Sequence, residues 1–188
     1  MLDTSLRSGR KSTAIAPHFE EFLRFQAQET IAAKDIPQRE AFAGQWIDLG
    51  GGARLSVVYP PQEARASDED DSSLVLKVSL RDAAFLLTGD IGPEGEASLV
   101  SNHADLRAPV LKVAHHGSRT STSAAFLAAV APLTAVISVG EGNGYGLPSP
   151  ETLDRLGGRP VFRTDRDGDV EMSTDGRRLW IRVERDEG

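Results

Sequence analysis

The sequence contains no cysteine, which excludes disulfide bonds, a cysteine nucleophile and thiolate zinc sites. No stretch approaches the roughly 18–20 consecutive apolar residues that a membrane-spanning helix requires. Residues 1–12 contain Arg and Lys but lack the apolar core of a secretory signal. Histidine is also scarce, with four in the chain. We therefore expect a soluble segment, cytoplasmic when the chain is considered alone.

Basic residues are outnumbered by acidic ones, with 21 Lys and Arg against 28 Asp and Glu and a net charge of −7. This balance argues against a protein that holds nucleic acid by bulk positive charge. It is compatible with an enzyme that meets phosphates through bound metal ions. The length of 188 residues fits one globular domain, and 39% hydrophobic and 26% charged residues are typical of a soluble one.

The hydrophobic pattern changes near residue 44. The spacing of Phe19, Phe22 and Phe25 predicts a helix over about 17–34, so residues 1–44 are interpreted as an N-terminal helical segment of the same domain. Residues 45–188 alternate short strands with helices, which predicts an α/β domain with mixed sheets and flanking helices. Strands are predicted at 45–49, 53–59, 73–80, 84–88, 109–114, 133–139, 160–163, 170–173 and 179–183, and helices at 93–102, 121–130 and 149–156.

Two strand ends carry the residue types best suited to chemistry. Asp90 follows a buried strand, and a carboxylate in that position can bridge two cations that stabilise a shared hydroxide. His115 and His116 follow another apolar strand and precede a Gly-Ser loop, where imidazoles can bind a metal or transfer protons. Taken singly, each feature is also typical of ordinary structure, namely a strand-to-helix turn and a pair of surface histidines.

Several ordered segments together resemble one family. The segments are Ser73–Leu76, Leu86–Asp90, Val110–Ser118 with Ser121–Ser123, Ala135–Gly140 with Asn143–Gly146, and Arg163–Asp165 ahead of Gly168. In their order and spacing they resemble the metallo-β-lactamase-like domain of ComEC-type competence proteins. These are membrane proteins that pass transforming DNA into bacteria. The resemblance extends from about Trp46 to the end of the chain.

The resemblance implies a four-layered αββα sandwich and a divalent metal, zinc or manganese. By position, Asp90 matches the metal-bridging aspartate of the family and His115 matches its later histidine ligand. His116 and Ser118 match positions that line the site, with a role in proton transfer or phosphate contact, and His116 is also a candidate ligand.

A loop carrying Asn143 and Tyr145 matches the family's loop at the mouth of the same site and is interpreted as a substrate loop. Three departures accompany the resemblance. The first ligand cluster of the superfamily, His-x-His-x-Asp-His, is absent from the 188 residues. An asparagine usual before Ser-Leu-Val-Leu is replaced by an acid, aligned at Asp70, which is a further candidate ligand. A histidine usual before a proline is Leu147, which cannot replace its hydrogen bonds.

The missing cluster implies that this chain corresponds to the later half of the domain only. We expect a metal-dependent hydrolase domain that cleaves phosphodiesters, with DNA as the substrate of the complete domain. The upstream half or a neighbouring polypeptide would supply the remaining ligands, and a full-length relative would be associated with the inner membrane. Two alternatives stay open: an inactive remnant or binding module of the same fold, and a metallo-hydrolase of another substrate completed by a partner chain.

Overall fold

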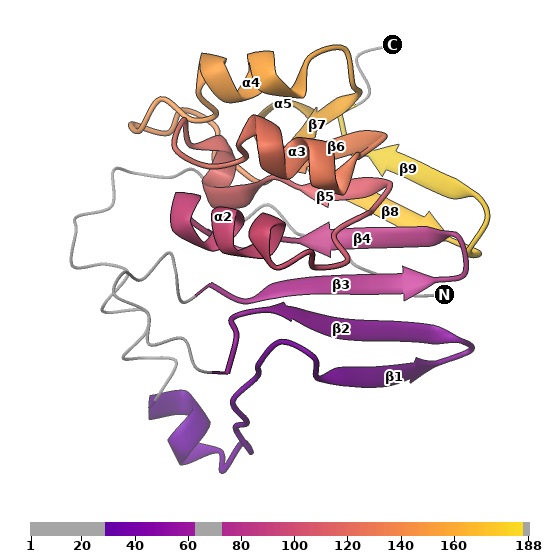
Figure 1. Cartoon of the computed structure of the whole chain (residues 1–188). Coiled ribbons are helices and arrows are strands. Elements are labelled where there is room, and N and C mark those ends of the chain that lie inside the picture. Colours follow the sequence, from indigo (N-terminus) through magenta and orange to yellow (C-terminus); the bar gives the residue numbers. More distant parts are fainter. Residues whose placement is uncertain (1–28, 63–72, 186–188) are drawn as a thin grey trace.

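A computed structural model of the chain describes residues 29–62 and 73–185 (Figure 1). Seven strands form one mixed sheet and two form a separate antiparallel pair, which confirms the predicted α/β class. The strands are β1 (Trp46–Gly50), β2 (Ala53–Tyr59), β3 (Val75–Leu80), β4 (Ala83–Leu87), β5 (Val110–Lys112), β6 (Thr134–Ile137), β7 (Val161–Arg163), β8 (Val170–Thr174) and β9 (Leu179–Val183). The helices are α2 (Pro93–Ser101), α3 (Ala124–Val130), α4 (Pro150–Leu156) and α5 (Thr164–Asp167), with a 3₁₀ turn η2 (Ala114–Gly117).

The order of the strands places the helices on one side of the large sheet. The strands β1 to β7 lie in sequence order, antiparallel from β1 to β4 and parallel from β4 to β7. Each parallel connection is a right-handed crossover by default, so a sheet that grows in one direction keeps its helices on the same face. Accordingly α2, α3 and α4 cover one face, and the hairpin β8–β9 lies behind the other (Figure 1).

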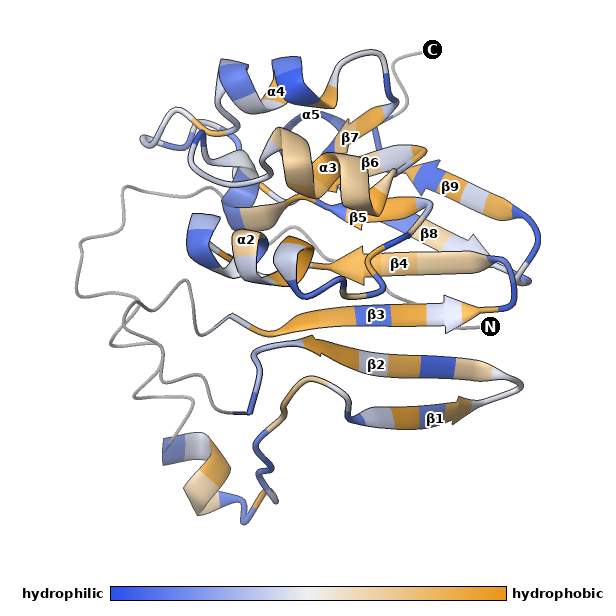
Figure 2. Ribbon diagram, in the orientation of Figure 1, coloured by the Kyte–Doolittle hydropathy of each residue, from blue (hydrophilic) through white to orange (hydrophobic). Residues whose placement is uncertain are grey.

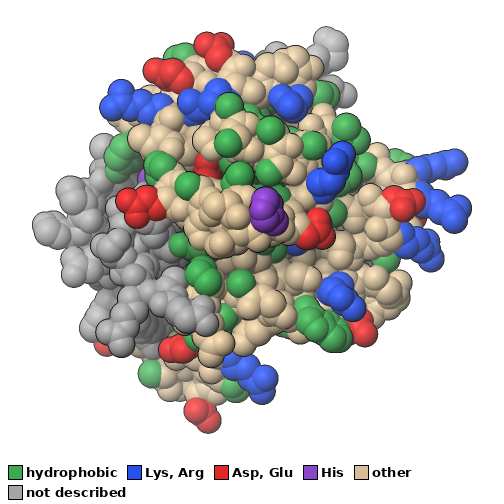
Figure 3. All heavy atoms as spheres, in the orientation of Figure 1, with side chains coloured by type: hydrophobic (Ala, Val, Ile, Leu, Met, Phe, Trp, Pro, Cys, Tyr) green, Lys and Arg blue, Asp and Glu red, His purple; other side chains and the backbone are tan. Residues whose placement is uncertain are grey.

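Two apolar clusters hold these layers together. The larger cluster packs the helices against the sheet through side chains such as Leu86, Leu111 and Phe126. The smaller one packs the hairpin on the opposite face, where Val110 and Val136 of the sheet contact Val170, Met172 and their neighbours. The central strands β3 to β6 consist mainly of apolar residues (Figure 2). On the surface of the helix-covered face, acidic and basic side chains are interspersed (Figure 3).

Serine side chains cap the starts of α3 and α4. Ser123 and Ser149 accept hydrogen bonds from the backbone N–H groups of Phe126 and Thr152, respectively. Such side-chain caps satisfy donors that have no partner inside the helix. Pro150 follows the second cap at a position where a proline needs no N–H.

All nine strands and the three helices predicted over residues 45–188 are present, within a few residues at their ends. The short elements η2 and α5 were not predicted. Most of the helix predicted over 17–34 lies outside the described residues. The part that is described is helical at residues 29–33. Asp70 also lies outside them. Within 29–62 and 73–185, no helix combines the length and apolarity needed to cross a membrane.

Candidate functional site

Asp90 lies in a turn that is fixed at the carboxyl end of β4. The Thr88 hydroxyl donates a hydrogen bond to the carbonyl of Lys112 on the neighbouring strand, at 2.7 Å. The backbone N–H of Asp90 donates to the Ser73 hydroxyl at 3.2 Å. Gly89 has a φ of +55°, and a Cβ there would lie 3.3 Å from the Leu74 carbonyl oxygen, so a side chain would crowd the turn.

The two adjacent histidines occupy a left-handed turn after β5. His115, His116 and Gly117 have φ values of +47°, +53° and +84°. The backbone N–H of His115 donates to the carbonyl of Gly89 at 3.2 Å, which joins the ends of β4 and β5 directly. These strands are parallel, so their carboxyl ends meet at one edge of the sheet, where loop residues commonly form binding sites.

The side chain of His116 is oriented toward Asp90. Its Nδ1 lies 2.7 Å from the Ser138 carbonyl oxygen, and because a carbonyl can only accept, Nδ1 carries the proton and donates. Its Nε2 is 3.7 Å from Asp90 Oδ1, a separation too long for a hydrogen bond. In the neutral ring, Nε2 therefore carries the lone pair that a metal ion would use.

The geometry of this pair fits two ligands of one ion. Two donors about 2.1 Å from a tetrahedral ion lie about 3.4 Å apart, close to the separation of Nε2 and Oδ1. A ligating histidine ordinarily donates its other N–H to a carbonyl or carboxylate, as Nδ1 does here. Among the described residues, no group of three or more His, Asp or Glu side chains is placed to hold a metal ion. Within the described ranges, the spacing of Asp90 and His116 is thus compatible with two ligands of an ion but does not make a complete set.

His115 contributes to the same turn through its backbone. Its ring centroid lies 6.4 Å from that of His116, with the two rings nearly perpendicular. The metal-ligand role implied for His115, and that of Asp70 outside the described residues, stay predictions.

Lys112 places a cation beside Asp90. Its Nζ donates a hydrogen bond to the Gly89 carbonyl at 3.1 Å and lies 3.9 Å from Asp90 Oδ1. Burial lowers the pKa of the Lys112 ammonium, and the charge of Asp90 opposes that shift. The ammonium therefore holds the Gly89–Asp90 turn and faces the carboxylate at the same time.

Ser118 follows the histidines in a half-buried position. Its hydroxyl and that of Thr120 are 3.0 Å apart, and its carbonyl accepts a hydrogen bond from the Thr152 hydroxyl at 2.8 Å. The backbone N–H of Ser118 donates to the carbonyl of His115 at 2.9 Å. The structure therefore places Ser118 in the loop that begins at the histidines.

Asn143 and Tyr145 behave differently within the loop predicted to contact substrate. The Asn143 amide donates to the carbonyls of Gly140 and Leu147, at 3.1 and 2.8 Å, and its Oδ1 accepts from the Leu147 N–H at 3.0 Å. These contacts give Asn143 a role in holding its own loop closed. The Tyr145 side chain is 75% exposed and points to solvent.

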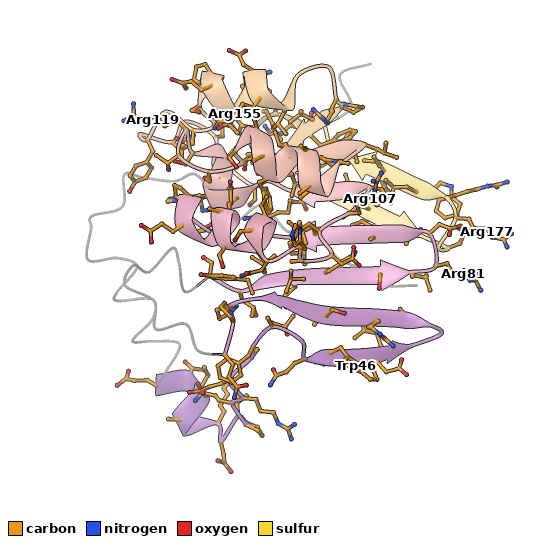
Figure 4. All side chains as sticks on the ribbon, viewed as in Figure 1. Trp46, Arg81, Arg107, Arg119, Arg155 and Arg177 are labelled. Atoms are coloured by element: carbon orange, nitrogen blue, oxygen red, sulfur yellow. The ribbon has the colours of Figure 1, made fainter. Side chains whose placement is uncertain are left out.

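A groove of about 810 Å³ lies on the helix-covered face of the sheet, away from the predicted site residues. Its lining includes Arg54, Lys77, Arg81 and Arg107. Figure 4 labels Arg81 and Arg107. Lys77 forms a 2.8 Å ion pair with Asp105, and the Arg54 guanidinium stacks 4.4 Å from the centroid of Trp46. The groove is therefore lined by both basic and acidic side chains, and neither Asp90 nor His116 lies in it.

Two charged residues near the site were not predicted from the sequence: the buried Glu96 of α2 and the half-buried Arg155 of α4. Both bind the backbone of the loop after Ser118. Their positions in helices resemble those of ordinary solvent-facing residues, and only tertiary contacts distinguish them. A weaker signal existed for Lys112, a lysine inside the otherwise apolar stretch Val110–Val113.

The chain is 36% identical to ComE operon protein 3 of Bacillus subtilis (strain 168) over 157 residues, 82% of this chain and 19% of that protein. It is 40% identical to competence protein ComA of Neisseria gonorrhoeae over 115 residues, 60% of this chain and 17% of that protein. The chain is homologous to ComEC-type competence proteins.

The ComEC-type relationship confirms the family that the motifs predicted. Recombination protein 2 of Haemophilus influenzae is a further relative, 32% identical over 105 residues, 56% of this chain and 13% of that protein. No family model matches the chain. The chain spans about a fifth of the length of the first two ComEC-type relatives.

Proposed function

We propose that this chain forms part of a metal-dependent hydrolase domain that cleaves DNA phosphodiester bonds during DNA uptake. The observation that carries the proposal is the pair formed by Asp90 Oδ1 and His116 Nε2 at the carboxyl ends of two parallel strands. Its geometry fits two ligands of one ion, and competence proteins are among the relatives of the chain.

Each residue of the pair has a defined task in this proposal. A bound Mn²⁺ or Zn²⁺ would lower the pKa of a water molecule and so supply hydroxide near neutral pH. Asp90 offers its carboxylate as an anionic ligand, and the Ser138 carbonyl keeps the His116 lone pair on Nε2. Lys112, with its ammonium near Asp90, balances the negative charge of the turn before an ion enters.

The sheet supports the further proposal that another polypeptide segment completes the domain as an αββα metallo-β-lactamase-like sandwich. On the face opposite the helices, Ile47, Leu55, Val78 and Phe85 form one row across β1 to β4. The hairpin β8–β9 packs against Phe85 at one end of the row, whereas Ile47 at the other end is 59% exposed. A second sheet would bury this row and could carry the remaining ligands.

Mn²⁺ titration of the purified chain tests the metal site. We expect weak binding, because two protein ligands are fewer than a catalytic zinc site ordinarily uses. Substitutions D90N and H116A should each weaken binding at least tenfold, since each removes a ligand. The matched control is H103N, which replaces an exposed histidine that has a similar positive φ.

Absence of Mn²⁺ binding by the wild-type chain, or equal binding by D90N, would contradict the metal site. A fluorescent single-stranded DNA oligonucleotide then tests the reaction. Slow Mn²⁺-dependent cleavage that D90N abolishes is the expected result. Mn²⁺ binding without any cleavage would instead favour a binding module of the same fold.

A further inference from the structure

The loop Gly117–Thr122, which follows the two histidines, contains an unusually placed threonine. Thr122 has a φ of +58° and is fully buried. Its hydroxyl is buried without a hydrogen-bond partner. A β-branched residue rarely adopts a positive φ, and a buried unpaired hydroxyl is costly. Such backbone strain persists only where the surrounding structure enforces it, and it concentrates at functional sites.

Helix α4 and the residue before it bind almost every carbonyl of this loop. The Ser149 N–H donates to the Gly117 carbonyl at 2.9 Å, and the Thr152 hydroxyl donates to the Ser118 carbonyl at 2.8 Å. The Arg155 guanidinium donates to the carbonyls of Arg119, Ser121 and Thr122, at 2.9, 2.9 and 3.1 Å. Arg155 and Arg119 are labelled in Figure 4, above α3.

Helix α2 holds the other side of the loop backbone. The Glu96 side chain, which is 1% exposed, accepts hydrogen bonds from the N–H groups of Thr122 and Ser123. The loop is therefore held between a cation that binds its carbonyls and an anion that binds its amides. Glu96 is buried and Arg155 is half-buried. Desolvating such charged groups is costly, and the hydrogen bonds to the loop backbone offset that cost only when the loop keeps a well-defined position.

The position of the loop bears directly on the histidines. Gly117 joins it to His116, and a Cβ at Gly117 would lie 2.5 Å from the Pro148 Cβ, so the junction has little freedom to move. We propose that Arg155 and Glu96 are positioning residues, which fix the Gly117–Thr122 loop and through it hold the His116 imidazole opposite Asp90. The expected effect on metal affinity rests on the proposed function, whereas the effect on His116 does not.

The test compares R155Q, R155K and E96Q with the wild-type chain. The matched control is R159Q, because Arg159 also donates to two backbone carbonyls, those of Pro132 and Leu156, but does not contact the loop. The first measurement is the ¹⁵N spectrum of the His116 ring, which reports the nitrogen that carries the proton. The second is the Mn²⁺ dissociation constant, and the third is the melting temperature.

We expect the proton of neutral His116 on Nδ1 in the wild-type chain and in R159Q. In R155Q and E96Q the proton should redistribute toward Nε2. Mn²⁺ affinity should fall about tenfold or more, the size of loss expected when a group that orients a metal ligand is removed. R155K keeps the positive charge but lacks the planar guanidinium, so its His116 ring spectrum and its Mn²⁺ affinity should lie between those of the wild-type chain and those of R155Q. If R155Q does not fold, R155K and E96Q provide the comparison.

Wild-type ring spectra and wild-type Mn²⁺ affinity in both R155Q and E96Q, with changes in melting temperature alone, would overturn the proposal. Such a result would reduce the two residues to general structural supports. A wild-type chain that binds no Mn²⁺ would contradict the proposed metal site, and the ring spectra would still decide the positioning role.

Discussion

Single residues at the site adopt backbone conformations that most side chains avoid. His115 and His116 are both left-handed, at a cost of roughly 1–2 kcal/mol for each residue. The hydrogen bonds from the His115 N–H to Gly89 and from the Ser149 N–H to Gly117 hold the turn in this form. The turn is therefore sensitive to changes that a flexible surface loop would tolerate.

Gly117→Ala is expected to destabilise the protein by about 3 kcal/mol. The substitution combines a positive φ of +84° with a Cβ only 2.5 Å from the Pro148 Cβ. Gly146→Ala is the matched control, because Gly146 has a φ of +68° but nothing within 4 Å of its Cβ position. We expect the control to lose about 1 kcal/mol, from the backbone conformation alone. Urea unfolding of both variants measures the difference, and equal losses would refute the steric contribution of Pro148.

The residues of the site were only partly predictable from the sequence. The strand ends predicted Asp90 and the histidines as one group, and the structure brings Asp90 and His116 together. Which histidine faces the carboxylate depends on the left-handed turn, which the sequence pattern does not encode. Arg155 was not predicted for a similar reason, since its role depends on carbonyls more than thirty residues earlier in the chain.

At the scale of secondary-structure elements, the strands of the α/β domain were predictable because their apolar runs are bounded by Gly, Pro and polar turns. The element α5 was not, because it is four residues long and is held by side chains. The Asp167 carboxylate accepts from the Arg163 N–H at 2.6 Å, and Asp165 pairs with the Arg163 guanidinium. Short elements of this kind follow from tertiary contacts more than from periodicity.

The turn of the hairpin β8–β9 should give stability that depends on pH. The Asp175 carboxylate accepts from the N–H groups of Arg178 and Arg177, both at 2.8 Å, and these bonds lower the pKa of Asp175. Because the folded pKa is lowered, the stabilisation is complete above the ordinary Asp pKa of about 3.9 and is lost as the pH falls through the folded value.

Asp175→Ala should therefore lower the urea midpoint at pH 7 and leave it nearly unchanged at acidic pH, where the wild-type carboxylate is protonated. Asp154→Ala, which removes an exposed carboxylate on α4, is the control and should show no such convergence. Urea midpoints of the three proteins at several pH values provide the measurement. A constant difference between Asp175→Ala and the wild type at all pH values would contradict the prediction.

At the scale of the whole molecule, the two faces of the large sheet are covered unequally. Helices α2, α3 and α4 pack along one face, and on the other the hairpin packs against the region of Val110 and Val136. The apolar row that ends at Ile47 continues beyond the hairpin contacts. Exposed apolar surface of this kind commonly marks an interaction site.

Ile47→Lys should reduce self-association of the isolated chain without lowering its melting temperature. Ile47 is 59% exposed on an edge strand, and a lysine there blocks edge-to-edge pairing and the apolar contact together. Leu133→Lys is the control, because Leu133 is 72% exposed but lies outside the row. Sedimentation velocity over a range of concentrations measures the association. Equal behaviour of Leu133→Lys and Ile47→Lys would show that the row has no special role.

The connection between β4 and β5 has a consequence for how the site arises. Asp90 and His116 both belong to one strand–helix–strand unit, built from β4, α2 and β5. Contacts between segments close in sequence form faster than contacts that require long loops to close. The backbone segments that carry Asp90 and His116 are therefore expected to meet early in folding, before β1 pairs with the sheet. The orientation of the His116 ring is completed later, when Ser138, which follows β6, is in place to accept its N–H.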